Sequence, residues 1–278
     1  MRQGTGVVAD TRSEGFTQVS IPNGYGAYLL GQLFEPWAVV LAARAGIRPG
    51  DRVLDVASGL GPVARLAAEA AGPGGLVTAS DISGAMLAAA AARPELPGWA
   101  PLEYLECSAS AIAADDDSFD VVLCQHGLQF FPDRAGAVSE MRRVVRTGGI
   151  VVLSTWAAEH PLGLFGSMNE TLREFGMAEP FPGAFNSDSY RVGLAELRGL
   201  FLAAGFQEVS AETVEINATW PTPEAATATL LGTPFGPLVL ALPADTQRQV
   251  RARLASKLGA SPEGVTVRTV SNIVSGTK

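Results

Sequence analysis

Short apolar stretches with strand character alternate with helix-like stretches along the middle of the chain. The strand-like stretches are residues 52–58, 76–82, 102–108, 119–127 and 150–156. Apolar residues at helical spacing fill residues 62–71, 83–96 and 134–145. Successive strands joined by helices at this pitch form right-handed βαβ units, in which the strands lie parallel in one sheet. The sequence therefore predicts an α/β fold built on a parallel sheet.

Outside this alternation the pattern changes. Before it, residues 25–45 have helical spacing, with a break expected before Pro36. After Trp156 come two insertions, residues 157–191 and 221–262.

The remaining elements resume the earlier rhythm. We expect helices at 192–206 and, inside the second insertion, at 245–259. Strands are expected at 207–220 and 264–274. The last strand alternates like a half-exposed strand, so we place it antiparallel beside its predecessor.

Composition excludes several classes of protein. The formal net charge of −8 argues against a nucleic-acid binder, which needs a basic face. The first residues lack the apolar core of a signal peptide, and no run of about 18 uncharged apolar residues exists. We therefore expect a cytoplasmic protein without stable membrane insertion. Only His126 and His160 offer imidazole, which excludes a multi-histidine metal site, and Cys107 and Cys124 are expected as buried free thiols.

The stretch "VLDVASGLGPVARLA" runs from a strand through two glycines into a helix. Gly59, Gly61 and Ala64 fit the G-x-G-x-x-G/A pattern of nucleotide-binding turns, where a missing Cβ lets the backbone approach a ligand. Asp55 precedes this turn and would oppose a pyrophosphate at the helix N-terminus. It suits instead the ammonium and sulfonium of S-adenosylmethionine (SAM), either directly or by accepting loop N–H groups. Alternatively, Asp55 only caps its own turn, which is compatible with SAM.

A second acidic residue, Asp81, ends the next strand-like stretch, about 20 residues after the glycines. An acid at this position accepts hydrogen bonds from ribose hydroxyls, which NAD and SAM share. Ile82 and Met86 would then pack on adenine. Alternatively, Asp81 is an acid favoured at a helix N-terminus beside the cap Ser83, and Met86 is plain core.

Four stretches in this order resemble class I SAM-dependent methyltransferases: "VLDVASGLG", "ASDIS…ML", "FDVVLCQHGLQFFPD" and "EMRRVVRTGGIVVLSTW". The resemblance is to the branch of the ubiquinone/menaquinone-biosynthesis methyltransferases and many small-molecule methyltransferases of actinobacterial secondary metabolism. "YGAYLLGQLFEPWAVVLA" also resembles that branch's N-terminal helix. The resemblance implies a Rossmann-like, seven-stranded sheet of order 3-2-1-4-5-7-6, with the last strand antiparallel and helical cap insertions.

The same resemblance implies a division of the chain and of the cofactor site. Residues 1–47 would cover the cofactor, and residues 48–278 would form the SAM-binding domain, with the two insertions as lids. The methionyl part of SAM would be lined by Asp55, Ala57, Gly59 and Gly61, and its ribose held by Asp81.

The remaining implied contacts lie at the adenine and at the reactive methyl. Ser108 and Ala109 stand where the family usually has an Asp followed by a small residue near the adenine amino group. Ser108 is a departure, because its hydroxyl accepts a hydrogen bond without charge. Cys124 and Gln125 would lie beside the methionine and its methyl.

Aromatic side chains suit the cationic sulfur and an apolar acceptor, although each also suits plain packing. The candidates are Tyr25, Tyr28, Phe34, Trp37, Phe130 and Phe131, with Tyr25 and Tyr28 favoured because their segment would fold over the cofactor.

A general base is needed only where the acceptor must lose a proton. His126, at the carboxyl edge of the sheet, is the better placed candidate and His160 the second, against a polar or structural role for each. The resemblance does not carry His126 over, because the family often has Gln there. "DDD" at 115–117 fits a solvated turn better than a metal cluster.

These features predict an enzyme that moves a methyl group from SAM to a small acceptor and leaves S-adenosylhomocysteine (SAH). The apolar insertion stretches "PFPGAF" and "LLGTPFGPLVLAL" favour a polyketide, terpenoid, quinone precursor or lipid, and would equally suit a homodimer contact. One alternative is a SAM-binding protein that does not methylate, such as a cyclase or binding module. The other, an NAD-linked oxidoreductase, is disfavoured by Asp55 and by the lack of a Tyr-x-x-x-Lys pair.

Overall fold

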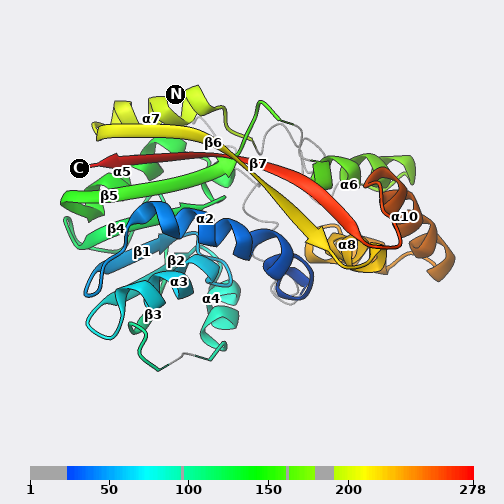
Figure 1. Ribbon diagram of the computed structural model, residues 1–278, viewed down its shortest axis with the longest axis horizontal. Coiled ribbons are helices and arrows are strands. Elements are labelled where there is room, and N and C mark those ends of the chain that lie inside the picture. The colour runs from blue at the N-terminus through cyan, green and yellow to red at the C-terminus, as the bar shows by residue number, and fades with distance from the viewer. Residues whose placement is uncertain (1–23, 95–96, 161–162, 179–190) are drawn as a thin grey trace, which may run out of the picture.

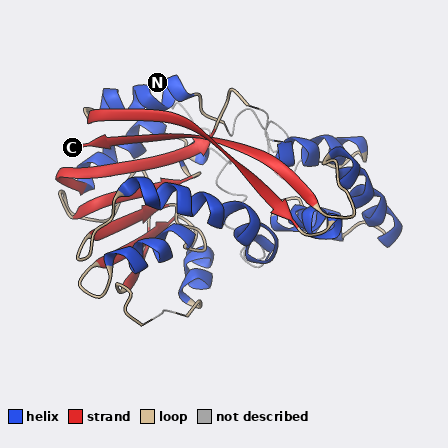
Figure 2. Cartoon of the chain, in the orientation of Figure 1, coloured by secondary structure: helices blue, strands red, loops and turns tan. Residues whose placement is uncertain are grey.

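The computed structural model describes residues 24–94, 97–160, 163–178 and 191–278 (Figure 1). The polar N-terminal stretch before residue 24 and the segment "PFPGAF" at 180–185 lie outside the described residues. In the described part, helices lie on both sides of one sheet (Figure 2). The fold is therefore of the α/β class, as the alternation of strands and helices predicts.

The sheet has seven strands in the order β3-β2-β1-β4-β5-β7-β6. Neighbouring strands from β1 to β5 pair in parallel, whereas β7 runs antiparallel to both β5 and β6. This order and the direction of the last strand confirm the prediction. The strands are β1 (Arg52–Val56), β2 (Leu76–Asp81), β3 (Leu102–Glu106), β4 (Phe119–Gln125), β5 (Val145–Trp156), β6 (Gln207–Trp220) and β7 (Val265–Thr277).

Helices cover the two faces of the sheet and bury separate apolar clusters. The π-helix η2, α2 and α3 lie over one face, and α5 and α7 lie over the other. Central strand residues such as Leu54, Leu123 and Leu153 are fully buried, and each contributes about 1.5–3 kcal/mol to stability. The helices around the sheet are η2 (Gly26–Phe34), α2 (Glu35–Ala45), α3 (Pro62–Ala71), α4 (Gly84–Ala91), η3 (Leu128–Phe130), α5 (Arg134–Val144) and α7 (Leu194–Ala204).

Local sequence signals fix where the helices after β1 and β2 begin. Gly61, at φ +74°, precedes α3, and Pro62 occupies its first turn, where a missing N–H costs no hydrogen bond. The Ser83 hydroxyl accepts the Met86 N–H and caps α4, as predicted. These two helix starts set the positions of the loops that follow β1 and β2.

Two expectations about the flanking elements are wrong. The helix over residues 25–45 does not break before Pro36, because η2 continues directly into α2 with Pro36 in the first turn of α2. The strand β7 is not half-exposed: only its first residues alternate, because β5 and β6 flank the rest and helices cover it.

By length and composition alone, the run Gly26–Ala45 is apolar enough to cross a membrane, with a mean hydropathy of 1.2. It is the one such helix in the described part of the chain. Its residues Leu33, Trp37 and Leu41 are buried in the core against the sheet. Packing inside the protein therefore accounts for its apolar inner face.

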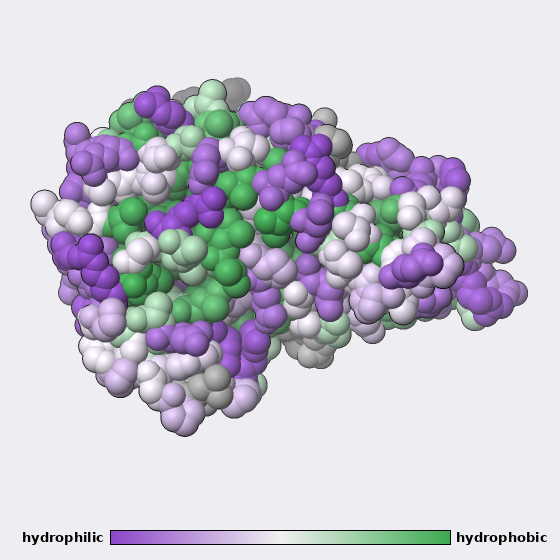
Figure 3. Space-filling view, viewed as in Figure 1, coloured by the Kyte–Doolittle hydropathy of each residue, from purple (hydrophilic) through white to green (hydrophobic). Residues whose placement is uncertain are grey.

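A lobe of short helices projects from the end of the sheet (Figure 1). Beyond the last β5 pairs, β6 and β7 continue as a two-stranded ribbon that leads to this lobe. Hydrophilic residues dominate its far end around α10, whereas hydrophobic ones gather over the sheet-bearing body on the face shown in Figure 3. The lobe contains α6 (Gly163–Glu174), α8 (Pro223–Ala228), η5 (Thr229–Gly232), α9 (Gly236–Leu240) and α10 (Ala244–Lys257).

Both insertions therefore contribute to one structural unit. The helix α10 lies where the sequence predicts one, whereas α6 was not anticipated in the first insertion. Its sequence "GLFGSMNETLRE" begins with two glycines within four residues, which weakens the local helix signal. Contacts of α6 with α10 and β7 stabilise this helix, which the local sequence does not predict.

Candidate active site

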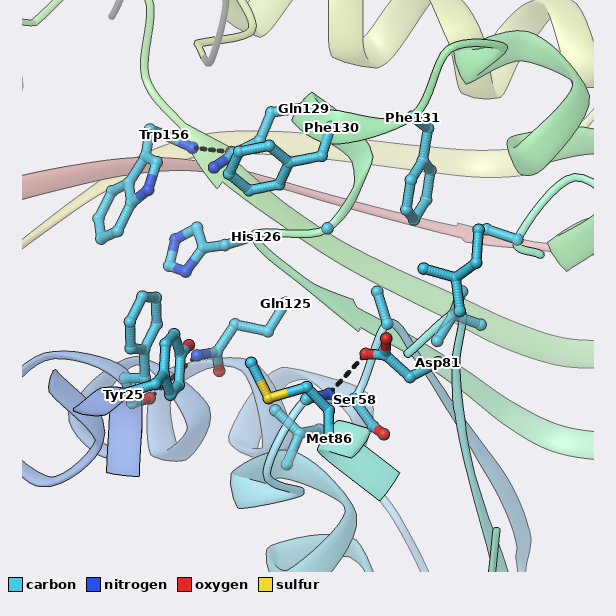
Figure 4. Close-up of a pocket in the computed structure, with 18 of the residues that line it drawn as sticks. Tyr25, Ser58, Asp81, Met86, Gln125, His126, Gln129, Phe130, Phe131 and Trp156 are labelled. Atoms are coloured by element: carbon cyan, nitrogen blue, oxygen red, sulfur yellow. Dashed lines mark hydrogen bonds between the residues drawn. The ribbon is translucent and has the colours of Figure 1, made fainter. Parts of the chain in front are cut away.

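A cavity of about 500 Å³ opens at the carboxyl edge of the sheet, between the sheet and the lobe (Figure 4). Ligands of open α/β sheets bind at this edge. The loops after β1, β2, β3 and β4 form one part of its wall, and β5, α6 and the η5–α9 turn form another. The carboxyl edge of the sheet, where the strand pattern predicts ligand binding, therefore carries a cavity.

The end of β1, just before the glycine loop, holds the first predicted acid. The Asp55 Oδ2 accepts the Ala64 N–H at 3.0 Å, so the carboxylate ties the start of α3 to the strand. Asp55 is 1% exposed, and its Oδ1 has no hydrogen-bond partner among the described residues. Burial, with a smaller contribution from the Asp81 charge, raises the pKa of Asp55 to about 8, although the Ala64 N–H acts in the opposite direction. The residue shapes the loop, and its second oxygen is a buried acceptor without a partner in the described part of the chain.

The backbone of this loop is bent by positive φ angles at Ala57 (+56°), Gly59 (+55°) and Gly61 (+74°). A Cβ added to Gly59 would meet no atom within 4 Å, so the cavity lies directly beside that backbone. Ala57 and Gly59 line the cavity, whereas Gly61 lies behind them at the start of α3 and does not.

The second acid, Asp81, joins two loops. Its Oδ2 accepts the Gly59 N–H at 2.8 Å and its Oδ1 accepts the Ser83 N–H at 2.9 Å. Burial raises the pKa of Asp81, although these two N–H groups act in the opposite direction. Each carboxylate oxygen keeps a second lone pair for another donor. Asp81 therefore lies at the cavity wall with spare hydrogen-bonding capacity.

Most of the other predicted cofactor residues line the same cavity. They are Tyr25, Ile82, Met86, Ser108, Ala109 and Gln125. Gln125 donates from Nε2 to the Phe34 carbonyl at 3.0 Å, and its Oε1 has no partner among the described residues.

Cys124 is an exception, because its side chain is fully buried and does not line the cavity. Burial and the Asp55 charge raise its pKa to about 12, which keeps the thiol protonated. The other thiol, Cys107, is only half-buried and does line the cavity, so it is not the core residue that was expected.

The aromatic candidates divide into two groups. Tyr25 and Phe34, whose rings stack at 4.7 Å, line the cavity together with Phe130 and Phe131. Tyr28 and Trp37 do not. Trp37 is buried in the core and donates from Nε1 to the Thr269 hydroxyl at 3.1 Å. The Trp37 ring packs behind the cavity wall, 5.7 Å from the His126 ring, and Tyr28 is not among the lining residues, which corrects the expectation for Tyr28 in particular.

His126 lies in the cavity wall in a strained backbone conformation, at φ +51°. Its ring stacks on the Trp156 indole, with centroids 3.9 Å apart and planes 12° apart. Its Nε2 lies 2.8 Å from the Ser271 Oγ, and its Nδ1 has no partner among the described residues. Burial lowers the pKa of His126 to about 3, so the imidazole is neutral at physiological pH.

The other candidates for polar chemistry are not in the cavity. His160 lies in a separate cavity of about 260 Å³ beside Lys257 and Arg268. In the acidic turn, Asp116 pairs with Arg143 and Asp117 with Lys278, and all three acids are exposed. No cluster of three or more His, Cys, Asp or Glu suited to a metal occurs among the residues described.

Sequence reasoning missed several residues of the cavity wall. Gln129 is fully buried, and its Oε1 accepts the Trp156 N–H at 3.0 Å while its Nε2 has no partner in the described part of the chain. A single amide inside the apolar run "GLQFF" was the available signal for this residue. The others come from β5 and from the two insertions and carried no local signal: Trp156, Phe165, Met168, Asn169, Thr233 and Phe235.

Comparison with known proteins gives a consistent family assignment. The ubiE/COQ5 methyltransferase family matches residues 29–163. An uncharacterised protein of Mycobacterium tuberculosis strain H37Rv is 35% identical over 189 residues, which span 66% of each chain. The ubiquinone/menaquinone biosynthesis C-methyltransferase UbiE of Xanthomonas campestris is 40% identical over 118 residues, covering 42% of this chain and 47% of its own. The chain thus spans about two thirds or less of the length of these relatives.

Solved structures with the same fold extend over more of the chain. A putative methyltransferase from an antibiotic biosynthesis pathway of Anabaena variabilis has a TM-score of 0.61 at 16% identity, covering 87% of this chain and 97% of its own. The phosphoethanolamine N-methyltransferase 2 of Haemonchus contortus, in complex with SAM, has a TM-score of 0.61 at 18% identity, covering 99% of this chain and 61% of its own. These two likenesses concern the fold. The family match assigns residues 29–163 to the ubiE/COQ5 methyltransferase family, and the two structures share the fold of this chain.

Proposed function

We propose that the chain transfers the methyl group of SAM to a small, largely apolar acceptor bound in the same cavity. The observation that carries this proposal is the cavity's division into two chemically different sides (Figure 4). We define the cofactor side as Asp55, Ala57, Gly59, Asp81 and Met86. We define the acceptor side as His126, Gln129, Phe130, Trp156 and Phe165.

The charges of the cavity wall fit SAM better than a dinucleotide. Its described lining includes Asp55, Asp81 and Asp133 but no Lys or Arg. A pyrophosphate would therefore meet acidic side chains without a compensating cation, whereas an ammonium and a sulfonium would favour the ionised form of these acids. The unpartnered Asp55 Oδ1 is the kind of buried atom that a bound cation satisfies.

The remaining cofactor contacts follow from the same geometry. Asp81 has lone pairs left for ribose hydroxyls after accepting from Gly59 and Ser83. Ile82, which is 49% exposed at the mouth, and the buried Met86 offer apolar surface for adenine, next to Ser108 and Ala109. Residues 24–47 would cover the cofactor through Tyr25.

When bound, SAM supplies both the methyl group and its leaving group. The protein then has to orient the two reactants and exclude water, and orientation alone is worth up to roughly 7–11 kcal/mol of the barrier. Gln125, whose Oε1 is free, and the Tyr25–Phe34 stack lie between the two sides and suit this role. His126, neutral at physiological pH, contacts the acceptor rather than the cofactor in this arrangement.

The two insertions would select the acceptor. Phe165, Met168 and Asn169 come from the first, and Thr233 and Phe235 from the second. Aromatic and aliphatic surface dominates this side, which favours a molecule with a large apolar part.

Two measurements test the proposal. Calorimetry should give saturable SAH binding that is lost in Asp81→Ala and kept in Asp115→Ala, an exposed acid in the turn before β4. Labelled methyl from SAM should then enter the organic-solvent fraction of a cell extract. SAH binding without any transfer, to either the organic or the aqueous fraction, would instead support a SAM-binding protein that does not methylate.

A further inference from the structure

Two nitrogen atoms on the acceptor side lack hydrogen-bond partners. His126 is 4% exposed and Gln129 is fully buried. The His126 Nδ1 and the Gln129 Nε2 have no partner among the residues that the structure describes. Buried polar atoms are rarely left unpaired in folded proteins, and both of these belong to side chains that line the cavity, so they point to a bound group.

One residue, Trp156, holds both side chains in place (Figure 4). Its backbone N–H donates to the Gln129 Oε1 at 3.0 Å, and its indole stacks on the His126 ring at 3.9 Å. Because only the amide oxygen accepts from an N–H, this bond fixes the orientation of the Gln129 amide. The free end of Gln129 is therefore its NH₂ group, a donor.

The hydrogen bond to Ser271 decides which His126 nitrogen carries the proton. The Ser271 Oγ is buried and lies 2.8 Å from the His126 Nε2, which is its one hydrogen-bond partner in the described part of the chain. If the Ser271 hydroxyl donates its hydrogen to Nε2, that nitrogen is the acceptor and the ring proton lies on Nδ1. The opposite tautomer would leave the buried hydroxyl hydrogen unpaired with or without a ligand, whereas a ligand oxygen can pair an Nδ1–H, so we take the free Nδ1 as a donor as well.

We infer that the His126 Nδ1–H and the Gln129 NH₂ form a two-donor subsite for a carbonyl, enolate or phenolate oxygen of the methyl acceptor. This inference rests on the proposed function and narrows its substrate class to apolar molecules with such an oxygen. An ammonium has only hydrogens to offer and would meet two donors, so a protonated amine would be a poor ligand here. Both donors are neutral, and they stabilise negative charge on the oxygen most strongly in a dry cavity. Ser271 is a positioning residue, because it acts through His126.

The tautomer can be observed directly, because the chain contains only His126 and His160. Nitrogen-15 NMR of histidine-labelled protein, with His160→Gln to assign the remaining signals, should show His126 protonated on Nδ1. Ser271→Ala should weaken or abolish that preference. A proton on Nε2 in the wild-type chain would overturn the inference.

Ligand preference tests the subsite without knowledge of the natural acceptor. The SAH-saturated protein would be titrated with 1-acetylnaphthalene, 1-ethylnaphthalene and 1-(1-naphthyl)ethylammonium, which share a ring and differ in one group. We expect the ketone to bind about tenfold more tightly than the hydrocarbon, a difference of about 1.4 kcal/mol, and the ammonium to bind most weakly. Equal binding of ketone and hydrocarbon would contradict the inference.

Variants separate hydrogen bonding from packing. Gln129→Met and His126→Phe, the second of which keeps a ring on Trp156, should each reduce the ketone preference about threefold or more while leaving 1-ethylnaphthalene binding nearly unchanged. Gln249→Met, an exposed change on α10, is the matched control. An equal loss for both probes would mean a packing role only and would overturn the inference. SAH titration of the same samples tests the proposed function separately, since failure to bind SAH would refute the cofactor site itself.

Discussion

The two sides of the cavity are built in different ways. On the cofactor side, a hydrogen bond from Gly59 to Asp81 links the loop after β1 to the end of β2, and one from Ala64 to Asp55 ties α3 to β1. On the acceptor side, His126 and Gln129 are held by Trp156 and Ser271, which come from other strands, and Phe165 comes from the lobe. Backbone geometry therefore determines the shape of the cofactor side, and long-range side-chain packing determines that of the acceptor side. The acceptor side can change by substitution in the insertions while the cofactor side stays intact.

The strongest test of this contrast is Asp81→Ala. The change removes the acceptor for the Gly59 and Ser83 N–H groups and should lower SAH affinity about 100-fold, because both loops lose their common anchor. The free energy of unfolding should fall by about 1–3 kcal/mol per unpaired buried group. Calorimetry and urea denaturation measure the two effects. Binding within threefold of wild type would show that the loops keep their shape without Asp81.

Gly127→Ala should disturb both sides at once. A Cβ at Gly127 would lie 2.7 Å from the Ala57 Cβ and 2.9 Å from the Cys124 Sγ, so the turn after β4 would be forced away from the cofactor loop. We expect about 1–3 kcal/mol of destabilisation, together with weaker SAH binding and weaker binding of the naphthalene probes. Gly199→Ala, on α7 with nothing within 4 Å of the new Cβ, should instead be neutral or stabilising by up to about 1 kcal/mol. Loss of probe binding with normal SAH binding would show that the two sides are not coupled through Gly127.

Affinity for SAM should depend on pH through the cofactor side alone. Burial raises the pKa of Asp55 to about 8 in the free protein, and a bound cation should lower it again. Asp55 is therefore mostly protonated below that value and must release its proton on binding, so affinity should rise with pH between about 5.5 and 7.5, by up to tenfold per unit. Calorimetry in buffers of different ionisation enthalpy measures both affinity and proton release. Asp55→Asn should remove the slope, and binding of 1-ethylnaphthalene should show none.

The smallest effect expected is that of Phe165→Leu. The Phe165 ring centroid lies 6.2 Å from that of Trp156, and the side chain is half-buried, so a shorter apolar residue keeps most of the contact. We expect about threefold weaker binding of 1-acetylnaphthalene and unchanged SAH affinity, measured by the same titrations. Leu240→Ala, at an exposed position on α9, serves as the control. A parallel loss of SAH affinity would contradict the separation of the two sides.

Much of the fold could be predicted because its signals are local. The helix α3 and the strand β6 have the predicted bounds, and Ser83 caps α4 as expected. The position of β7 between β5 and β6 was available only from the family resemblance, since alternation along one strand does not say which neighbours it has. The first-insertion helix α6 was missed because its stability comes from packing against other elements.

The site divides in the same way. Asp55, Gly59 and Asp81 could be placed from the sequence because both acids lie at the ends of strands and Gly59 lies in the glycine turn after β1. Tyr28 was misplaced because helical spacing alone does not say which face of the N-terminal helix turns to the cavity, and Trp37 packs behind the cavity wall. Gln129 and Ser271 lie on segments far apart in the sequence, and no spacing rule connects them.

The strand β7 also affects how the protein is assembled during translation. Residues 150–156 of β5 pair with residues 271–277 of β7, so β5 has an unpaired edge until the ribosome has released a much later part of the chain. Pairing across such sequence separations slows folding and leaves an open edge on which nascent chains can mispair. Ser271 arrives with that strand, so its hydrogen bond to the His126 ring can form only once β7 has been made.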